Sequence, residues 1–302
     1  MKNLYICSTV YHLIIALIKI DLNVENRIVL LDGIVDVEKF CLKLNKIDNI
    51  EAVVFTDNSV YSRYPIYKKY QLELMDRLLD NIKDIYMFID ANHIGWYLHR
   101  KKINYHLLED GYNCFLYPSQ HKYNWWRFFL KGIPKVHGYS KYCTDIEVNS
   151  IKGIPRDSRY NKFIELPRKK IFERMTASQK AILCDLFDYE PINIQQPSVL
   201  ILTQPLHSDV QWGMTYEQHI DYYSEICKQY PQHYIYLKVH PRDHTDYSGF
   251  KATILSNSYP IEMLDIFGEY KFNIGITHSS TALDFLNCVE EKIVLFDLGS
   301  MK

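Results

Sequence analysis

Short apolar runs alternate with stretches of helical periodicity through the first third of the chain. The apolar runs predict strands at residues 3–7, 27–31, 51–55, 85–89 and 105–108. Apolar positions recur at helical spacing in residues 11–20, 37–44 and 66–82. Strands and helices that alternate in this way predict a parallel, doubly wound sheet.

A second alternating series occupies the last third of the chain. Its predicted strands are residues 199–202, 234–239, 252–255, 272–276 and 292–296, and its predicted helices are residues 216–228, 261–267 and 281–286. Between the two series, a capping box from Thr176 to Gln179 announces a connector helix. We therefore predict an α/β fold with two Rossmann-like domains, residues 1–165 and 198–302, joined by a connector at residues 166–197.

The pattern is less regular in residues 112–159. This segment contains the cluster Trp125-Trp-Arg-Phe-Phe-Leu-Lys131. Aromatic rings edged by basic side chains can lie on a membrane surface, but clusters at helical spacing also commonly face the core. Both interpretations stay open.

Composition narrows the class of protein. The net charge of −1 and the pI near 6.9 argue against a nucleic-acid-binding protein, which needs a strongly basic surface. The seven cysteines are scattered and never have C-x-x-C spacing, so neither a disulfide framework nor a zinc site is indicated. We find no signal peptide and no apolar run near the roughly 20 residues that a membrane span needs. A cytoplasmic location fits best.

The strongest candidate site follows the predicted strand at residues 234–239. Lys238, His240 and Arg242 crowd its carboxyl end, and Pro241 stops the strand because proline cannot donate to a ladder. In open α/β sheets, ligands bind outside the carboxyl ends of the strands. These residues therefore indicate an anion site, although a turn residue flanked by solvated charges would give the same pattern.

Two further segments fit a nucleotide site in the second domain. Ser279 and Ser280 lie between a predicted strand and a helix, where free N–H groups favour phosphate, although serine also makes ordinary helix caps. Glu262 lies in the first turn of a predicted helix, where it can accept ribose hydroxyls or complement the helix dipole. The chain has no G-x-G-x-x-G, P-loop or D-x-D motif, so no dinucleotide fingerprint and no acidic metal cage is indicated.

These motifs together resemble a known family. The set consists of Ser8-Thr9-Val-Tyr-His12-Leu, Glu109-Asp110-Gly111, Leu202-Thr203-Gln204-Pro205, Lys238-Val-His240-Pro241, Pro260-Ile-Glu262 and His278-Ser279-Ser280. In this order it is similar to the bacterial sialyltransferases of glycosyltransferase family 52, the lipooligosaccharide and capsular polysaccharide type. The resemblance covers nearly the whole chain, and the ordered set is more specific than any one motif.

The resemblance implies a GT-B fold whose two domains face each other across the active-site cleft. It also implies inverting, metal-independent transfer of sialic acid from CMP-sialic acid to a galactose-type hydroxyl. Asp110 would then be the general base, and His240 would bind or protonate the departing phosphate. The implied donor-binding residues are Thr203, Gln204, Lys238, Pro241, Glu262, Ser279 and Ser280. The implied acceptor-binding residues are Thr9, His12 and Glu109.

Several alternatives stay open from the residues. Asp209 is a second candidate for the base. A UDP-sugar donor, or a non-catalytic protein that binds nucleotides or glycans, would keep the same fold. The expected partners are a nucleotide-sugar donor and a glycan acceptor, with no nucleic acid and no cofactor, while peripheral contact with the inner membrane surface and a homodimer are both compatible with the sequence. The chain ends at Lys302 without the terminal helices usual in GT-B proteins, as expected of a compact member or of a shortened chain.

Overall fold

The protein is described by a computed structural model that covers residues 1–57, 69–110, 136–209, 212–268, 271–280 and 282–296. The chain divides into two compact units, Met1–Leu186 and Phe187–Lys302. The boundary lies inside α8 (Ala177–Phe187), which belongs to the segment predicted as a connector. Each unit is described by itself.

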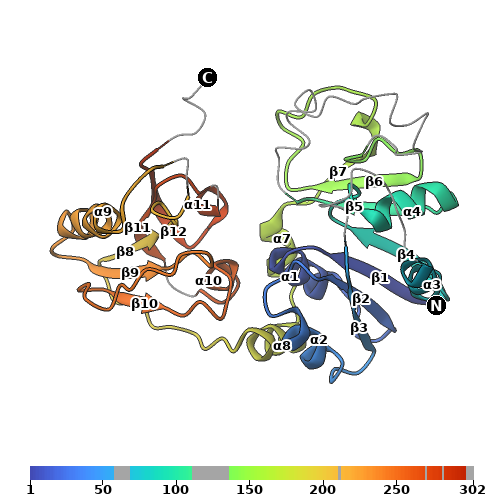
Figure 1. Ribbon diagram of the computed structural model, residues 1–302, viewed down its shortest axis with the longest axis horizontal. Coiled ribbons are helices and arrows are strands. Elements are labelled where there is room, and N and C mark those ends of the chain that lie inside the picture. The colour runs from blue at the N-terminus through green and yellow to red at the C-terminus, as the bar shows by residue number, and fades with distance from the viewer. Residues whose placement is uncertain (58–68, 111–135, 210–211, 269–270, 281, 297–302) are drawn as a thin grey trace. The chain divides into compact units, whose positions relative to one another are not determined.

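The first unit contains a seven-stranded parallel sheet with the order β3-β2-β1-β4-β5-β6-β7 (Figure 1). Its elements in chain order are β1 (Lys2–Cys7), α1 (Val10–Lys19), β2 (Asn26–Leu31), α2 (Val37–Leu44), β3 (Ile50–Phe55), α3 (Lys69–Leu78), β4 (Ile82–Met87), α4 (His93–Lys101), β5 (Tyr105–Leu108), β6 (Cys143–Val148), the 3-10 helix η3 (Tyr160–Lys162), β7 (Phe163–Glu165), α7 (Arg168–Glu173) and α8.

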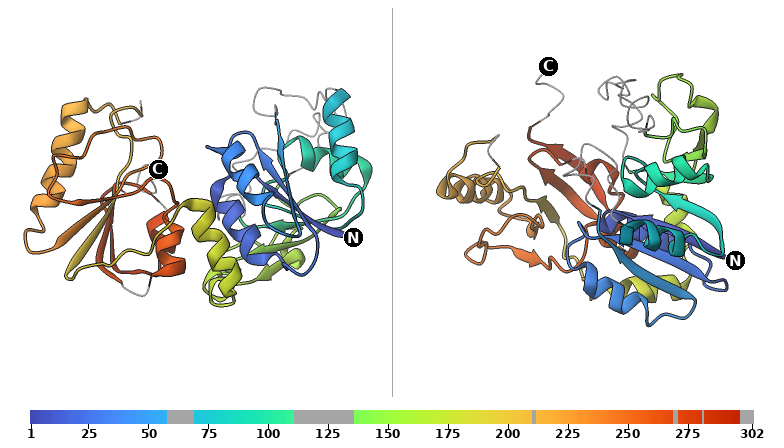
Figure 2. Two further views of the ribbon diagram at one scale, coloured as in Figure 1. Left: turned by 90° about the horizontal axis from the view of Figure 1, so that it is seen from below. Right: turned by 45° about the vertical axis from the view of Figure 1, so that its right-hand side comes forward.

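Helices cover both faces of this sheet, as expected when helical crossovers connect parallel strands. Helices α1 and α2 cover one face and α3 and α4 cover the other (Figure 2), and every residue of β2 is buried. Thr9 starts α1 by accepting a hydrogen bond from the backbone N–H of His12. Gln179 of α8 donates to the carbonyl oxygens of Leu17, Ile18 and Ile20, which anchors α8 to the end of α1.

The second unit contains a five-stranded parallel sheet with the order β10-β9-β8-β11-β12. Its elements are β8 (Ser198–Leu202), α9 (Tyr216–Lys228), β9 (Tyr234–Lys238), β10 (Thr253–Leu255), α10 (Glu262–Phe267), β11 (Phe272–Thr277), α11 (Ala282–Phe285) and β12 (Val289–Val294). Helices α9 and α10 lie on opposite faces of this sheet (Figure 2). The predicted α/β fold class, with a parallel sheet in each half, is confirmed.

The structure corrects some predicted boundaries. The helix predicted through residue 82 ends at Leu78, and Asn81, in the left-handed region with a φ of 59°, leads into β4. The last strand begins at Val289 rather than at residue 292, because it is an edge strand that exposes Glu290, Glu291 and Lys292.

Several elements of the first unit were not predicted, among them the short helices η3 and α7. The helix α4 was missed, and so were β6 and β7, which lie in or just beyond the irregular segment. Strand β6 has polar residues at three of its six positions, Thr144, Asp145 and Glu147, and β7 is only three residues long. The aromatic cluster at residues 125–131 lies outside the described residues. No helix in the described part of the chain is both long and apolar enough to span a bilayer.

Candidate functional site

A cavity of about 190 Å³ lies at the carboxyl ends of the strands in the second unit. The sheet order reverses between β8 and β11, the switch point at which such folds bind ligands. Residues that follow β8, β9, β10 and β11 all line the cavity. It gathers seven residues that the sequence marks as candidates, namely Thr203, Gln204, Lys238, His240, Pro241, Glu262 and Ser280.

Lys238, the last residue of β9, is a buried cation in the wall of this cavity. Its Nζ donates hydrogen bonds to the carbonyl oxygens of Ser256 and Tyr259, and it lies 3.9 Å from the centroid of the Tyr259 ring. Burial lowers the pKa of Lys238 to about 7, against the opposing effect of the Glu262 carboxylate. Lys238 therefore holds the segment after β10 in place, and it titrates near neutral pH.

Replacing Lys238 by methionine is expected to remove one component of the pH dependence of stability. In the unfolded chain the pKa of this lysine is about 10.4. Between pH 7 and that value the unfolded chain therefore binds more protons than the folded chain. Wild-type stability should therefore gain a contribution that grows with pH in this window. Melting temperatures of both proteins at pH 6, 8 and 9.5 test this. A wild-type minus variant difference that stays constant or falls as pH rises contradicts it.

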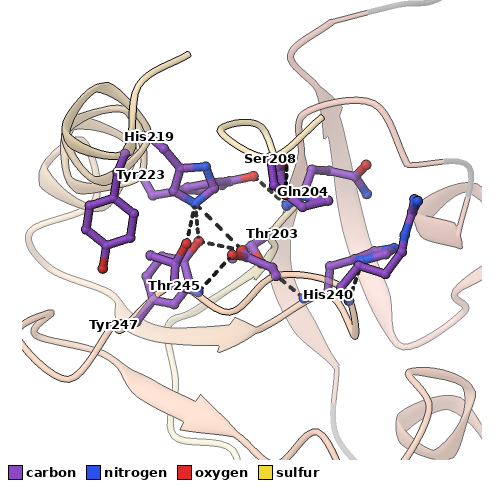
Figure 3. Close-up of polar contacts among 12 residues, drawn as sticks. Thr203, Gln204, Ser208, His219, Tyr223, His240, Thr245 and Tyr247 are labelled. Carbon is purple, nitrogen blue, oxygen red and sulfur yellow. Dashed lines mark hydrogen bonds and ion pairs between the residues drawn. The ribbon is translucent and has the colours of Figure 1, made fainter. Parts of the chain in front are cut away.

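His240 has a fixed backbone and a fixed ring. Its backbone N–H donates to Oγ1 of Thr203 at 3.1 Å, and its Nδ1 accepts from the backbone N–H of Arg242 at 3.1 Å (Figure 3). Since Nδ1 is an acceptor, the proton of the neutral ring lies on Nε2. Burial and the Arg242 guanidinium lower the pKa of His240, whereas Asp243 opposes this shift. An anion in the cavity can accept a hydrogen bond from the Nε2–H group.

The hydroxyl groups near β11 serve partly as local caps. The backbone N–H of Ser280 donates to Oγ1 of Thr277, and Oγ of Ser280 accepts from the backbone N–H of Ala282. Ser280 lines the cavity, while Ser279 is outside its lining. His278 hydrogen-bonds through Nδ1 with the hydroxyl of Tyr222 at 2.8 Å. That Ser279 and Ser280 bind phosphate stays a prediction, and Ser280 is the better placed of the two because it lines the cavity.

Asp110 follows β5 in the first unit and is paired with His12. Nε2 of His12 lies 2.5 Å from Oδ1 of Asp110, and Nδ1 of His12 accepts from the backbone N–H of Ser8. The His12 ring is fully buried and stacks on Phe88, at a centroid distance of 4.1 Å. Burial lowers the pKa of His12, although Asp110 opposes this effect. A neutral ring that donates from Nε2 therefore orients the Asp110 carboxylate, which remains 31% exposed.

The three residues expected to bind an acceptor have contacts within the first unit, and their acceptor role stays a prediction. Thr9 caps α1, and both ring nitrogens of the buried His12 are engaged. Glu109 is buried, pairs with Arg168 at 3.0 Å and accepts from the backbone N–H of Asn149. Burial raises the pKa of Glu109, while both partners oppose this effect. These contacts give all three residues a role in shaping the edge of the sheet around Asp110.

Asp209, the alternative base, lies in the second unit in the turn that follows β8. Its backbone N–H donates to the carbonyl oxygen of Pro205, and its carbonyl accepts from the N–H of Trp212. Asp209 is not among the described residues that line the cavity. The structure therefore does not place the Asp209 carboxylate in the lining of this cavity.

One group of residues has the composition of a metal site. Within the described ranges, ligand atoms of His207, His219 and Asp243 lie within 4.8 Å of one another. The fit is poor, because the Asp243 oxygens already accept hydrogen bonds from Thr203, Tyr247 and Thr245. Nε2 of His219 is likewise already engaged, at 2.6 Å from the Tyr247 hydroxyl. We interpret this group as a hydrogen-bond network.

A larger groove of about 790 Å³ lies elsewhere on the second unit. It is lined by the end of α9, the start of β9 and residues 246–251. None of the predicted site residues lines it. Because ligands of parallel sheets bind at the carboxyl ends of the strands, the smaller cavity at the end of β9 is the better candidate.

Among the comparisons with known proteins, the match to a family model agrees with the motif set. The family model described as glycosyltransferase family 52 matches residues 25–299. An uncharacterized protein of Haemophilus influenzae is 31% identical over 188 residues, which cover 60% of this chain and 59% of the length of that relative. Among solved structures, the S. aureus MnaA-UDP co-structure covers 93% of this chain and 74% of its own chain, with 10% sequence identity and a TM-score of 0.45.

Proposed function

The chain belongs to glycosyltransferase family 52, and we propose that it transfers sialic acid from CMP-sialic acid to a galactose-type hydroxyl. The acceptor would be a capsular or lipooligosaccharide glycan, and transfer would invert the anomeric centre without a metal ion. The observation that carries this proposal is the cavity at the carboxyl ends of the second sheet, where Lys238, His240 and Ser280 come together.

The donor side of the reaction needs stabilisation of a departing phosphate. When the bond from sialic acid to CMP breaks, negative charge develops on the phosphate oxygen. His240 presents a proton on Nε2, and the anion raises the affinity of the ring for a second proton. An anion in the cavity favours the protonated form of Lys238, whose pKa burial lowers to about 7, and the resulting ammonium adds positive potential. Glu262 at the start of α10 lines the same cavity and can accept hydrogen bonds from the ribose hydroxyls.

The acceptor side needs a base, which we assign to Asp110. The His12 ring holds one carboxylate oxygen, and the exposed part of the side chain is available to the acceptor hydroxyl. A carboxylate oriented in this way can take the hydroxyl proton as the oxygen attacks sialic acid. Asp110 and His240 lie in different units, so the proposed reaction requires both units of the chain. Peripheral contact with the cytoplasmic face of the inner membrane would suit such an acceptor.

Incubation with CMP-sialic acid and a lactose-type acceptor in the presence of a chelator tests the proposal. We expect CMP release and a sialylated product of the expected mass, with the inverted anomer visible by NMR. We also expect CMP to raise the melting temperature more than UDP does, because a ligand that binds only the folded state stabilises it. Turnover only after divalent metal is restored contradicts metal independence.

Two other outcomes identify the alternatives. Protection by UDP alone, with product formed from a UDP-sugar, indicates a different donor on the same fold. Protection by a nucleotide without turnover on a panel of acceptors indicates a non-catalytic nucleotide-binding protein.

A further inference from the structure

A chain of buried hydrogen bonds runs behind the cavity and ends at His240. The Thr203 hydroxyl accepts from the backbone N–H of His240 at 3.1 Å and donates to Oδ2 of Asp243 at 2.9 Å. Its single proton and one lone pair are therefore both used, which fixes its orientation. Asp243 in turn donates its backbone N–H to the carbonyl oxygen of His240 at 2.8 Å. The segment from His240 to Asp243 is thus tied at both ends.

Helix α9 and the segment after β9 extend the chain away from the cavity. The Tyr247 hydroxyl donates to Oδ2 of Asp243 at 2.8 Å, so its oxygen accepts from Nε2 of His219 at 2.6 Å. The backbone N–H of Thr245 donates to Oδ1 of Asp243 at 3.1 Å. In Figure 3 the contacts of Thr203, His219 and Thr245 converge on one group of atoms. Asp243 is the centre of this network.

Such a network is costly for a role in stability alone. Asp243 and Tyr247 are each 3% exposed, and His219 is fully buried. A buried carboxylate loses its hydration, and apolar side chains of similar size would often stabilise a core as well. Burial by itself would raise the pKa of Asp243, but the hydrogen bonds that it accepts outweigh burial and hold that pKa well below its usual range. The carboxylate therefore stays charged behind His240.

We propose that Asp243 is a positioning residue for His240, supported by Tyr247 and His219, and that this network sets the direction in which Nε2 of His240 faces the donor phosphate. The inference rests on the proposed function. Asp243 fixes the turn through Thr203 and through its own N–H, and within this turn Arg242 donates its N–H to Nδ1 of His240. Neither Asp243 nor Tyr247 lines the cavity, so both act through His240 rather than on the ligand.

The test compares Asp243→Asn and Tyr247→Phe with wild type. We expect kcat to fall about 100-fold in Asp243→Asn, since displacement of a catalytic group by about 1 Å can cost this much, and about tenfold in Tyr247→Phe. The donor KM should change less than about threefold in both variants, because the lining of the cavity is intact. A matched pair adds a rescue, since Thr203→Ser keeps the bridging hydroxyl and Thr203→Val removes it. Activity should survive the first change far better than the second.

The control is Tyr97→Phe in the first unit. Tyr97 is also 3% exposed and also donates its hydroxyl to a carboxylate, that of Asp76. Tyr97 lies outside both candidate sites, so loss of its hydroxyl group should leave kcat unchanged. If Asp243→Asn does not fold, the milder Tyr247→Phe and the Thr203 pair carry the test. A donor KM that rises in step with the loss of kcat, or equal activity of Thr203→Ser and Thr203→Val, overturns the proposal.

A second measurement is independent of turnover. Nitrogen NMR of the His240 ring should show one tautomer, protonated on Nε2, in wild type and a mixture in Asp243→Asn. Unchanged His240 signals in that variant refute the positioning role even in a folded protein. If wild type releases no CMP at all, the proposed reaction fails, and the NMR comparison still decides whether Asp243 positions His240.

Discussion

Replacement of His240 by alanine is expected to lower kcat by about 10²- to 10⁴-fold, the range typical of a lost acid–base group. The ring supplies the Nε2 proton in the lining of the donor cavity, and no other histidine is among the described residues of that lining. Steady-state rates of CMP release from CMP-sialic acid measure the loss. The variant should still melt as a folded protein and should still be stabilised by CMP, although less than wild type.

His244 provides the matched control for this change. It follows in the same segment, but its side chain is exposed, and it is absent from the cavity lining. We expect His244→Ala to retain wild-type turnover. Comparable losses in the two variants, or near-wild-type turnover in His240→Ala, remove His240 from the reaction.

Replacement of Asp110 by asparagine is expected to lower kcat by a similar factor, about 10²- to 10⁴-fold. The amide keeps the size of the carboxylate and can still accept a hydrogen bond from His12, but it cannot take the proton of the acceptor. Because Asp110 lies in the first unit and the cavity lies in the second, stabilisation by CMP should be unchanged. Rates of transfer and CMP-dependent melting temperatures, measured side by side, separate the two roles.

Asp145→Asn is the control for Asp110. Asp145 also pairs with a histidine, His106, at 2.8 Å, and its side chain is 25% exposed against 31% for Asp110. This variant should retain transfer activity, since Asp145 belongs to no candidate site. Asp209→Ala decides between the two candidate bases. Near-wild-type transfer in Asp110→Asn together with loss in Asp209→Ala assigns the base to Asp209.

The motif at the end of β9 could be located from local pattern alone. A buried strand stopped by Pro241 predicts where the chain turns, and parallel topology predicts that such turns gather at one edge of the sheet. For this reason the sequence pointed to Lys238, His240 and Glu262, which do line one cavity. The ordered set of motifs also pointed to glycosyltransferase family 52, to which the chain belongs.

The hydrogen-bond partners of individual side chains could not be predicted from the local sequence pattern. Lys238 lines the cavity as expected of a donor-binding residue, but the sequence did not indicate that its Nζ also donates to the carbonyl oxygens of Ser256 and Tyr259. For Glu109, an expected acceptor-binding residue, nothing in the sequence indicated its pairing with Arg168. Asp243 carried no signal in the sequence beyond a polar residue after a strand, although it is the centre of the network behind His240.

The sequence by itself determined the alternation of strands and helices, the two parallel sheets and the strand ends at which chemistry is concentrated. These follow from short-range periodicity and from the restriction that proline places on a ladder. Only the tertiary structure decided that His12 orients Asp110 and that Asp243 holds His240 through Thr203. These hydrogen bonds depend on which donors and acceptors come into contact once water is excluded. His12 and Asp110 are 98 positions apart, and local sequence periodicity carries no information about a contact at that separation.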